Sequence, residues 1–292
     1  MKKARIQFVL SMLIVGSMGL FVRNIPFSSA QIALVRGILG CVFIFVFSLL
    51  SSQKVSGEKI KANRWILIAS GIALGVNWIF LFQAYKYTTI SNATICYYFA
   101  PVLVMIMSPL ILKESLNALK VMCIVAALVG LVCIAGVSQT LGQNDFVGIL
   151  YGLGAAVLYA TVIFLNKRLK DITGIESSIV QLGIAAVSLL PYVLLVDGVQ
   201  LDKMTVKPIV LLLIVGVVHT GVVYLLYFSS MRELPGQSIA ALSYIDPVVA
   251  IILATIFLHE KMTIVQLIGG ILILGATFVN EIYGQRKKYC RR

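Results

Sequence analysis

Three ionisable side chains, Arg36, His219 and Asp246, lie within otherwise apolar stretches of the sequence. An unpaired charge at the centre of a hydrocarbon layer costs at least ~2.5–3.5 kcal/mol, so each needs water, a polar partner or a solute. Asp246 could exchange protons or contact a cationic group, and His219, at a similar depth, could relay a proton if the two touch. Arg36 could bind a carboxylate with two hydrogen bonds, or extend to the interface as an anchor. The alternative interpretation is that Asp246 and His219 are buried residues whose hydrogen bonds serve only the structure.

Two prolines lie near the middle of apolar stretches, close to a set of polar and aromatic residues. Pro101 and Pro247 each remove a helical hydrogen bond, which frees the carbonyl groups of Tyr97 and Ser243. Free carbonyls are tolerated in a membrane where protein, water or ligand satisfies them, although a packing kink is the simpler alternative. We expect a small amphipathic solute pocket, and its predicted lining is Asn77, Trp78, Tyr97, Tyr98, Pro101, Ser243, Tyr244 and Pro247. The Trp and Tyr side chains could instead belong to an interfacial belt.

Composition places these residues in a membrane. Of the 292 residues 60% are hydrophobic and 12% are charged, and the mean hydropathy is +1.01. Helical runs of about 20 apolar residues cross a hydrocarbon core of about 30 Å. Ten such spans are predicted, near residues 6–22, 30–50, 65–85, 90–112, 118–137, 147–165, 178–196, 209–230, 238–258 and 264–280. The predicted fold class is therefore an all-α polytopic membrane protein.

The distribution of basic residues predicts the orientation of the chain. The net charge of +13 comes mostly from Lys and Arg at the two termini and in alternate connections, and this bias marks the cytoplasmic side. We expect both termini in the cytoplasm, a multi-pass protein of the plasma (inner) membrane, and no nucleic-acid partner. The first span resembles a signal peptide, with Ser28 and Ala30 as small residues of a cleavage site. Its removal would leave nine spans, so we interpret it as a mature helix.

Signatures of enzymes and metal sites are missing from the sequence. His259 and Glu260 lack the second histidine of an HExxH motif, and there is no Walker A or GxSxG sequence. The five cysteines have no CxxC spacing, and four of them lie in apolar stretches. The expectation is no enzymatic activity, no cofactor and no metal.

The two halves of the chain repeat one another. Pro101 and Glu114 are separated by the same interval as Pro247 and Glu260, and Gly75, Phe82 and Tyr98 match Gly221, Phe228 and Tyr244 at the same offset. Each half would hold five spans, an odd number, so the fold is predicted to be two inverted five-helix repeats, at residues 1–140 and 145–284, with a basic tail at 285–292. Inverted repeats are typical of secondary transporters, whose solute site lies where the halves meet. Ala100 is the counterpart of Asp246, so the acid is specific to the second half. Glu114 and Glu260 are interpreted as helix-end anchors.

The chain resembles the drug/metabolite transporter superfamily, and within it the EamA-like bacterial metabolite exporters. The resemblance rests on Arg36 in LVRGIL, on Pro101 to Glu114, and on Pro247 to Glu260 with the following KMTIVQLIGGILILGA. It covers nearly the whole chain. It implies a fold of five plus five helices with a central cavity, formed largely by the third, fourth, eighth and ninth spans. It also implies transport of amino acids, their derivatives or other small metabolites, often outward.

The resulting hypothesis is a secondary active transporter that exports amino acids or related small metabolites by alternating access, with proton coupling through Asp246 and His219. The alternatives are a passive facilitator or channel, an importer, and a membrane scaffold or sensor without transport. The expected partners are a small-molecule solute and the lipid bilayer, and the expected assembly is a monomer or homodimer.

Overall fold

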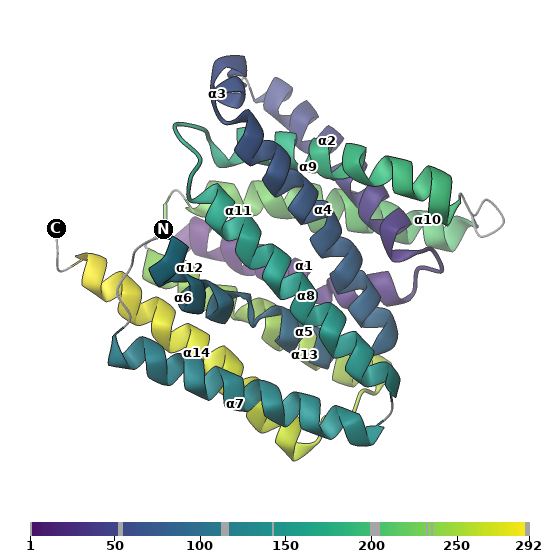
Figure 1. Cartoon of the computed structure of the whole chain (residues 1–292). Coiled ribbons are helices and arrows are strands. Elements are labelled where there is room, and N and C mark those ends of the chain that lie inside the picture. Colours follow the sequence, from purple (N-terminus) through teal and green to yellow (C-terminus); the bar gives the residue numbers. More distant parts are fainter. Residues whose placement is uncertain are drawn as a thin grey trace.

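The computed structural model describes residues 2–51, 55–111, 117–141, 143–198, 205–231, 233–234 and 236–289, and every regular element in these ranges is helical (Figure 1). Seven helical stretches are long and apolar enough to cross a membrane: Lys2–Arg23, Ser29–Leu50, Arg64–Tyr87, Ile90–Ile111, Asp145–Asn166, Gly174–Asp197 and Val206–Ser230. Three shorter apolar helical stretches accompany them, at Ala118–Ile134, Ile245–Leu258 and Ile264–Asn280. Together these stretches correspond in order to the ten predicted spans.

The helices follow one another with short connections. The first half contains α1 (Lys2–Arg23), α2 (Ser29–Leu50), α3 (Gly57–Ala62), α4 (Arg64–Tyr87), α5 (Ile90–Tyr97), α6 (Ala100–Ile111) and α7 (Ala118–Leu141). The second contains α8 (Gln143–Asn166), α9 (Gly174–Tyr192), η1 (Val193–Asp197), α10 (Val206–Leu213), η3 (Ile214–Val222), α11 (Val223–Met231), α12 (Gly236–Ser243), α13 (Ile245–Leu258) and α14 (Ile264–Tyr289). The short helix α3 was not predicted, because it lies in a mostly polar stretch between the second and third predicted spans.

Both proline-containing spans are interrupted, but the interruptions precede the prolines. α5 ends at Tyr97 and α6 begins at Ala100, while α12 ends at Ser243 and α13 begins at Ile245. Pro101 and Pro247 therefore lie in the first turn of the following helix, where a missing N–H group breaks no intrahelical bond. The predicted kinks are thus short interruptions of the helix, or breaks, at Tyr98–Phe99 and at Tyr244.

One feature of the eighth predicted span was missed: its middle, η3 (Ile214–Val222), is a π-helix. In the wide turn, backbone carbonyl oxygens accept hydrogen bonds from side chains five residues later. His219 Nδ1 lies 3.3 Å from the Ile214 carbonyl oxygen, and Thr220 Oγ1 donates to the Val215 carbonyl oxygen at 3.1 Å. Single π-helical turns inside α-helices are frequent at functional sites.

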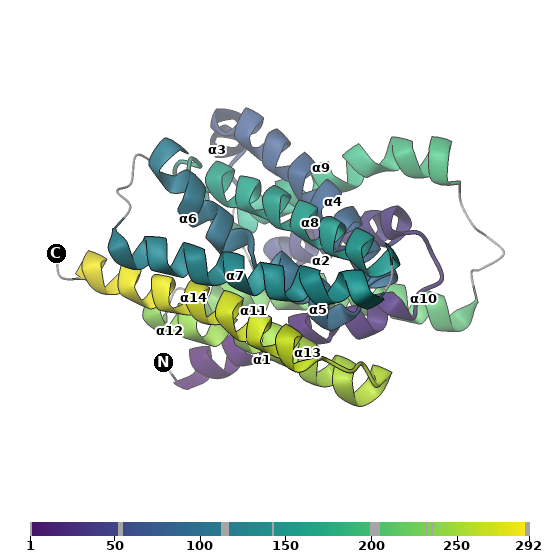
Figure 2. The same ribbon diagram turned by 60° about the horizontal axis from the view of Figure 1, so that its bottom comes forward.

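Helix packing places the two broken spans at the centre of the molecule. α5 packs against α13 and α8, and α1 packs against both α13 and α11. α4 packs against α8 and α9, and α2 against α9 and η3. α7 and α14 lie side by side in both views, along the bottom of Figure 1 and across the front of Figure 2, and they cross at Gly130 and Gly269. The start of α1 and the end of α14 lie on the same side of the bundle in both figures.

The outer surface of the bundle is strongly apolar. Leu50, Leu110 and Leu195 are about four-fifths exposed, which is expected for side chains that face lipid rather than water. The interior, in contrast, holds Arg36, Asn77, Gln181 and His219, each less than one-tenth exposed. A bundle with an apolar exterior and polar side chains inside matches a membrane protein with an internal polar site.

Candidate solute site

Arg36 of α2 is buried in the centre of the bundle, with 7% of its surface exposed. Its guanidinium carbon lies 4.2 Å from the centroid of the Trp78 ring and 5.8 Å from that of Phe82, both on α4. Stacking of this kind partly offsets the loss of water around a cation. The interface-anchor alternative for Arg36 is therefore wrong, and Trp78, 4% exposed, belongs to the interior rather than to an interfacial belt.

Two further groups position the Arg36 side chain. Nε donates to Thr220 Oγ1 at 2.8 Å, and Nη1 lies 3.3 Å from Met18 Sδ. No carboxylate of the described residues lies within ion-pair distance of the guanidinium. Close helix approach makes the contact with Thr220 feasible, because a Cβ atom on Gly40 would meet Thr220 Cγ2 at 2.5 Å. The site therefore holds a buried cation whose stacking and hydrogen-bond partners are all neutral.

Asp246 and Tyr98 join the two helix breaks. Tyr98, in the α5–α6 break, donates its hydroxyl hydrogen to Asp246 Oδ2 at 2.5 Å, and Asp246 lies in the first turn of α13. The ring of Tyr98 lies 6.4 Å from that of Tyr244, the residue of the other break. The carboxylate is thus held by a strong, charge-assisted hydrogen bond from the opposite half of the chain.

Two tyrosine side chains lie near both Arg36 and Asp246. Tyr85 and Tyr97 are each close enough to interact electrostatically with both charged groups. Tyr97 also contacts the rings of Tyr98 and Tyr159, at centroid distances of 6.2 and 5.2 Å. The guanidinium, the carboxylate and the tyrosines near both of them form an amphipathic cluster inside the bundle.

The pairing of Asp246 with His219, proposed from their similar depth, is not formed. His219 Nε2 lies 3.0 Å from Ser17 Oγ, and its ring packs 4.8 Å from that of Phe21. Helix α1 carries both of these partners and also packs on α13, since a Cβ atom on Gly16 would meet the Asp246 carbonyl oxygen at 2.6 Å. α1 therefore contacts both residues, and a similar depth on neighbouring spans did not imply contact between their side chains.

The remaining predicted residues have mixed environments. Asn77 donates to the Ala155 carbonyl oxygen at 2.6 Å, which ties α4 to α8, while its Oδ1 atom is buried without a hydrogen-bond partner. Ser243 donates to the Ile239 carbonyl oxygen at 2.8 Å, so its side chain serves its own helix. Ser243 contributes to the break but is a poor candidate for solute contact.

Residue types alone did not identify several members of the site. Thr220 contacts the charged group directly, and Tyr85 and Tyr224 lie within electrostatic range of Arg36. Each is an ordinary residue of an apolar span, and none is marked by charge or by proline. A helical periodicity analysis centred on Arg36 could not have found Thr220, because it comes from a distant span and a π-helical turn.

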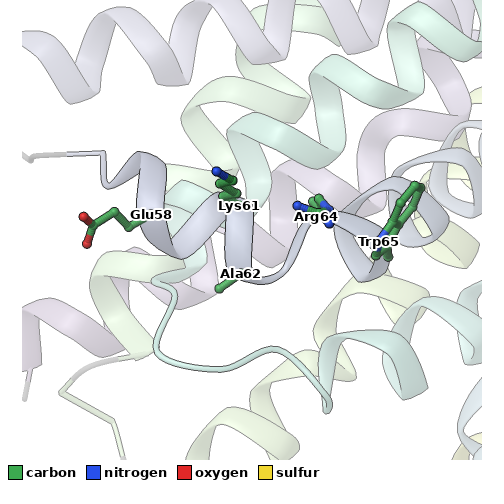
Figure 3. Close-up of a pocket in the computed structure, with 5 residues that line it drawn as sticks. All are labelled: Glu58, Lys61, Ala62, Arg64 and Trp65. Atoms are coloured by element: carbon green, nitrogen blue, oxygen red, sulfur yellow. The ribbon is translucent and has the colours of Figure 1, made fainter.

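Two hollows lined by described residues lie outside this site. One of about 500 Å³ opens beside α3 and the start of α4 (Figure 3), where Glu58, Lys61, Arg64 and Trp65 are spread along the chain. Trp65 is 71% exposed, and the Arg64 guanidinium carbon lies 5.5 Å from its ring centroid, an arrangement typical of interfacial anchors. The other, about 420 Å³, is an apolar groove between α13 and α14. Neither contains the buried charges.

Comparison with known proteins agrees with a transport role. The model of the EamA-like transporter family matches residues 2–136 and 146–281. The uncharacterized transporter YxxF of Bacillus subtilis is 29% identical over 286 residues, covering 97% of this chain and 91% of its own. The threonine/homoserine exporter RhtA of Escherichia coli is 26% identical over 218 residues, covering 74% and 71%.

A solved structure described as a crystal structure of a protein aligns with a TM-score of 0.64 at 18% identity, covering 96% of this chain and 97% of its own. At this identity the likeness concerns the fold alone. The two family matches span both halves and most of the chain. The chain therefore belongs to the EamA-like transporter family of the drug/metabolite transporter superfamily, and is a multi-pass membrane transporter, not an enzyme.

Proposed function

We propose that this protein is a secondary active transporter that exports amino acids or related small metabolites across the inner membrane by alternating access. The observation that carries the proposal is the buried Arg36 guanidinium, stacked on Trp78 and without a carboxylate partner among the described residues. A buried cation of this kind is costly unless an anion compensates it during function. The carboxylate of a solute fits that role, because it can accept two parallel hydrogen bonds from a guanidinium.

The opposite end of the site supports a solute that also carries a positive charge. Asp246 is the acid of the site. Its carboxylate can keep or give up the hydrogen bond from Tyr98 when a solute ammonium group arrives. The aromatic side chains near the two charges would contact the apolar part of the solute. A zwitterionic amino acid has this distribution of charge, and the exporter RhtA, a relative of this chain, is named for threonine and homoserine.

Alternating access follows if the two halves form inverted five-helix repeats. The packing of α4 on α9 corresponds to that of η3 on α2, and the packing of α1 on α13 to that of α8 on α5 and α6. Equivalent residues of the two breaks, Tyr98 and Tyr244, approach each other, as expected near a two-fold axis. These equivalences support ten spans with the solute site at the repeat interface.

Transport measurements in proteoliposomes test the proposal. The solute is first identified by thermal stabilisation of the purified protein against amino acids, nucleosides and polyamines. We expect a zwitterionic amino acid to stabilise the protein and to accumulate against its gradient when a proton gradient is imposed. Equilibration without accumulation would instead favour the facilitator or channel alternative, and inward flux in cells would favour an importer.

Proton coupling is proposed to use Asp246, whose protonation would weaken its hold on Tyr98. Asp246→Asn keeps the size of the side chain and cannot titrate. We expect this variant to exchange solute without proton-driven accumulation, so that its rate no longer depends on pH. An unchanged pH dependence would remove Asp246 from the coupling mechanism and leave solute binding as its role.

A further inference from the structure

Glu260 connects three helices at the end of the bundle opposite the chain termini. The residue follows α13, whose final residue Leu258 precedes His259 in the left-handed conformation, with φ of +53°. That turn directs Glu260 back towards α5 and α1. Its side chain is only 6% exposed, although it is a carboxylate in a connecting segment.

Within the part of the chain that the structure describes, all of the hydrogen bonds to this carboxylate come from the first half. Oε1 accepts from Arg23 Nη1, at the end of α1, at 2.5 Å and from the Ile90 N–H group at 2.9 Å. Oε2 accepts from the N–H group and the hydroxyl group of Ser91, at 3.2 and 3.0 Å. Ile90 and Ser91 begin α5, whose first N–H groups have no intrahelical acceptor, so a carboxylate there is favoured by hydrogen bonding and by the helix dipole.

Helices α5 and α13 are joined a second time, at their other ends. α5 runs from Ile90 towards the break at Tyr98, and α13 runs from the break at Tyr244 towards Glu260. The Tyr98–Asp246 bond joins their inner ends, and Glu260 joins their outer ends. Because α5 and α13 are packed together, a pathway between them to the site is closed on this side.

We propose that Glu260 is a latch that holds this end of the pathway closed, and that release of Arg23 and α5 from its carboxylate is a required step of opening. The proposal rests on the alternating access proposed above. It goes beyond a helix-end anchor, because an anchor would stabilise α13 alone. The Glu260 N–H group does bond to the carbonyl oxygen of Ala254 of α13 at 3.3 Å, but within the described ranges its carboxylate bonds to α1 and α5. Glu114, the equivalent residue of the first half, lies outside the described residues.

Distance measurements between spin labels test the latch. Labels are placed at Asn24→Cys and Lys261→Cys, two exposed positions adjacent in sequence to the Arg23–Glu260 pair, in full-length protein without its native cysteines. We expect one short-distance population in lipid nanodiscs. Glu260→Gln should lower the ratio of short to long distances about tenfold, because it removes the charge from three sets of hydrogen bonds.

Two further variants make the test specific. Arg23→Gln leaves the bonds to α5 intact and should shift the ratio in the same direction by a smaller factor. Asp145→Asn is the matched control, since Asp145 is a carboxylate at the same end that accepts from Thr88 Oγ1 at 2.6 Å, and it should leave the distances unchanged.

Distances in Glu260→Gln and Arg23→Gln that equal those of the unsubstituted protein would overturn the latch and leave Glu260 as an anchor. If Glu260→Gln does not fold, the Arg23→Gln distances decide the question alone. The labels report conformation without solute, so failure of the latch and failure of the transport proposal give different results. A protein that opens in Glu260→Gln yet moves no solute would refute only the transport function.

Discussion

Arg36 determines two properties of the protein that can be measured separately. Its guanidinium is buried against Trp78 and bonded to Thr220, so the protein without solute bears the cost of a buried charge. Solute binding would remove part of that cost. Arg36 therefore lowers the stability of the empty protein and raises its affinity for the solute.

Replacement of Arg36 by Met should reveal both effects. We expect the free energy of unfolding of the empty protein to stay the same or rise by up to about 1 kcal/mol, because an apolar side chain of similar length replaces an unpaired charge. The apparent Tm reports this change. Stabilisation by carboxylate-bearing solutes should disappear. Arg36→Lys should also lose most of it, since an ammonium group neither stacks nor binds bidentately in the same way.

The chain offers a matched control for this substitution. Arg64 also lies over a Trp ring, that of Trp65, but at the surface. Arg64→Met should leave solute-dependent stabilisation intact. Stabilisation of Arg36→Met by the same carboxylate-bearing solutes would show that the guanidinium does not bind them.

At the scale of residues, the sequence identified the unusual groups but not their partners. Arg36 and Asp246 were recognised because a charge in an apolar span is costly wherever it lies. The partners Thr220 and Tyr98 come from distant spans, and residue type gives no indication of which helices meet. Depth along a helix was also an insufficient guide, since it suggested His219 as the partner of Asp246.

At the scale of elements, the pair α7 and α14 shows how glycine sets the distance between helices. A Cβ atom on Gly130 would meet the Gly269 carbonyl oxygen at 2.6 Å, and one on Gly269 would meet the Gly130 carbonyl oxygen at 2.6 Å. Backbone atoms cannot rotate away as side chains can, so the contact depends on glycine at both positions.

Gly130→Ala should therefore separate the two helices and lower stability by about 1–3 kcal/mol, seen as a fall in the apparent Tm. Gly275 of α14 is the control, because a Cβ atom there would meet nothing within 4 Å. Gly275→Ala should leave the Tm unchanged or raise it, since Ala favours the helix by about 1 kcal/mol. Equal effects of the two substitutions would argue against a tight α7–α14 contact.

The elements were predicted well where composition changes along the chain and poorly where it does not. Apolar runs gave the spans, and the prolines marked the spans that break. The position of each break, before the proline, depends on how the surrounding helices pack. The π-helical turn of η3 has the same Val, Gly and Thr composition as an ordinary membrane helix, so no sequence signal separated the two.

At the scale of the whole molecule, topology is the property that most needs a direct test. The start of α1 and the end of α14 lie on one side of the bundle, as expected for an even number of spans. The contacts Ser56–Glu176 and Asn63–Lys170 lie between connections that the charge distribution assigns to the cytoplasm, and Arg23–Glu260 between connections assigned to the outside.

Single cysteines at Asn24 and Lys61, in a background without native cysteines, should therefore react from opposite sides. We expect a membrane-impermeant thiol reagent added to intact cells to label Asn24→Cys and to reach Lys61→Cys only after the cells are opened. Labelling of both positions in intact cells would contradict the ten-span topology.

The π-helical turn of η3 has a consequence for the history of the chain. Gly71 and Gly75 of α4 are separated by three residues and face Ile184 and Ala185 of α9, while Gly216 and Gly221 of η3 are separated by four and face Leu39 and Phe43 of α2. If the halves descend from one ancestral gene, a single inserted codon accounts for both the extra residue and the wide turn. That insertion, absent from the first copy, falls in the segment that carries His219 and Thr220, whose side chains contact the backbone carbonyls of Ile214 and Val215 that the wide turn frees.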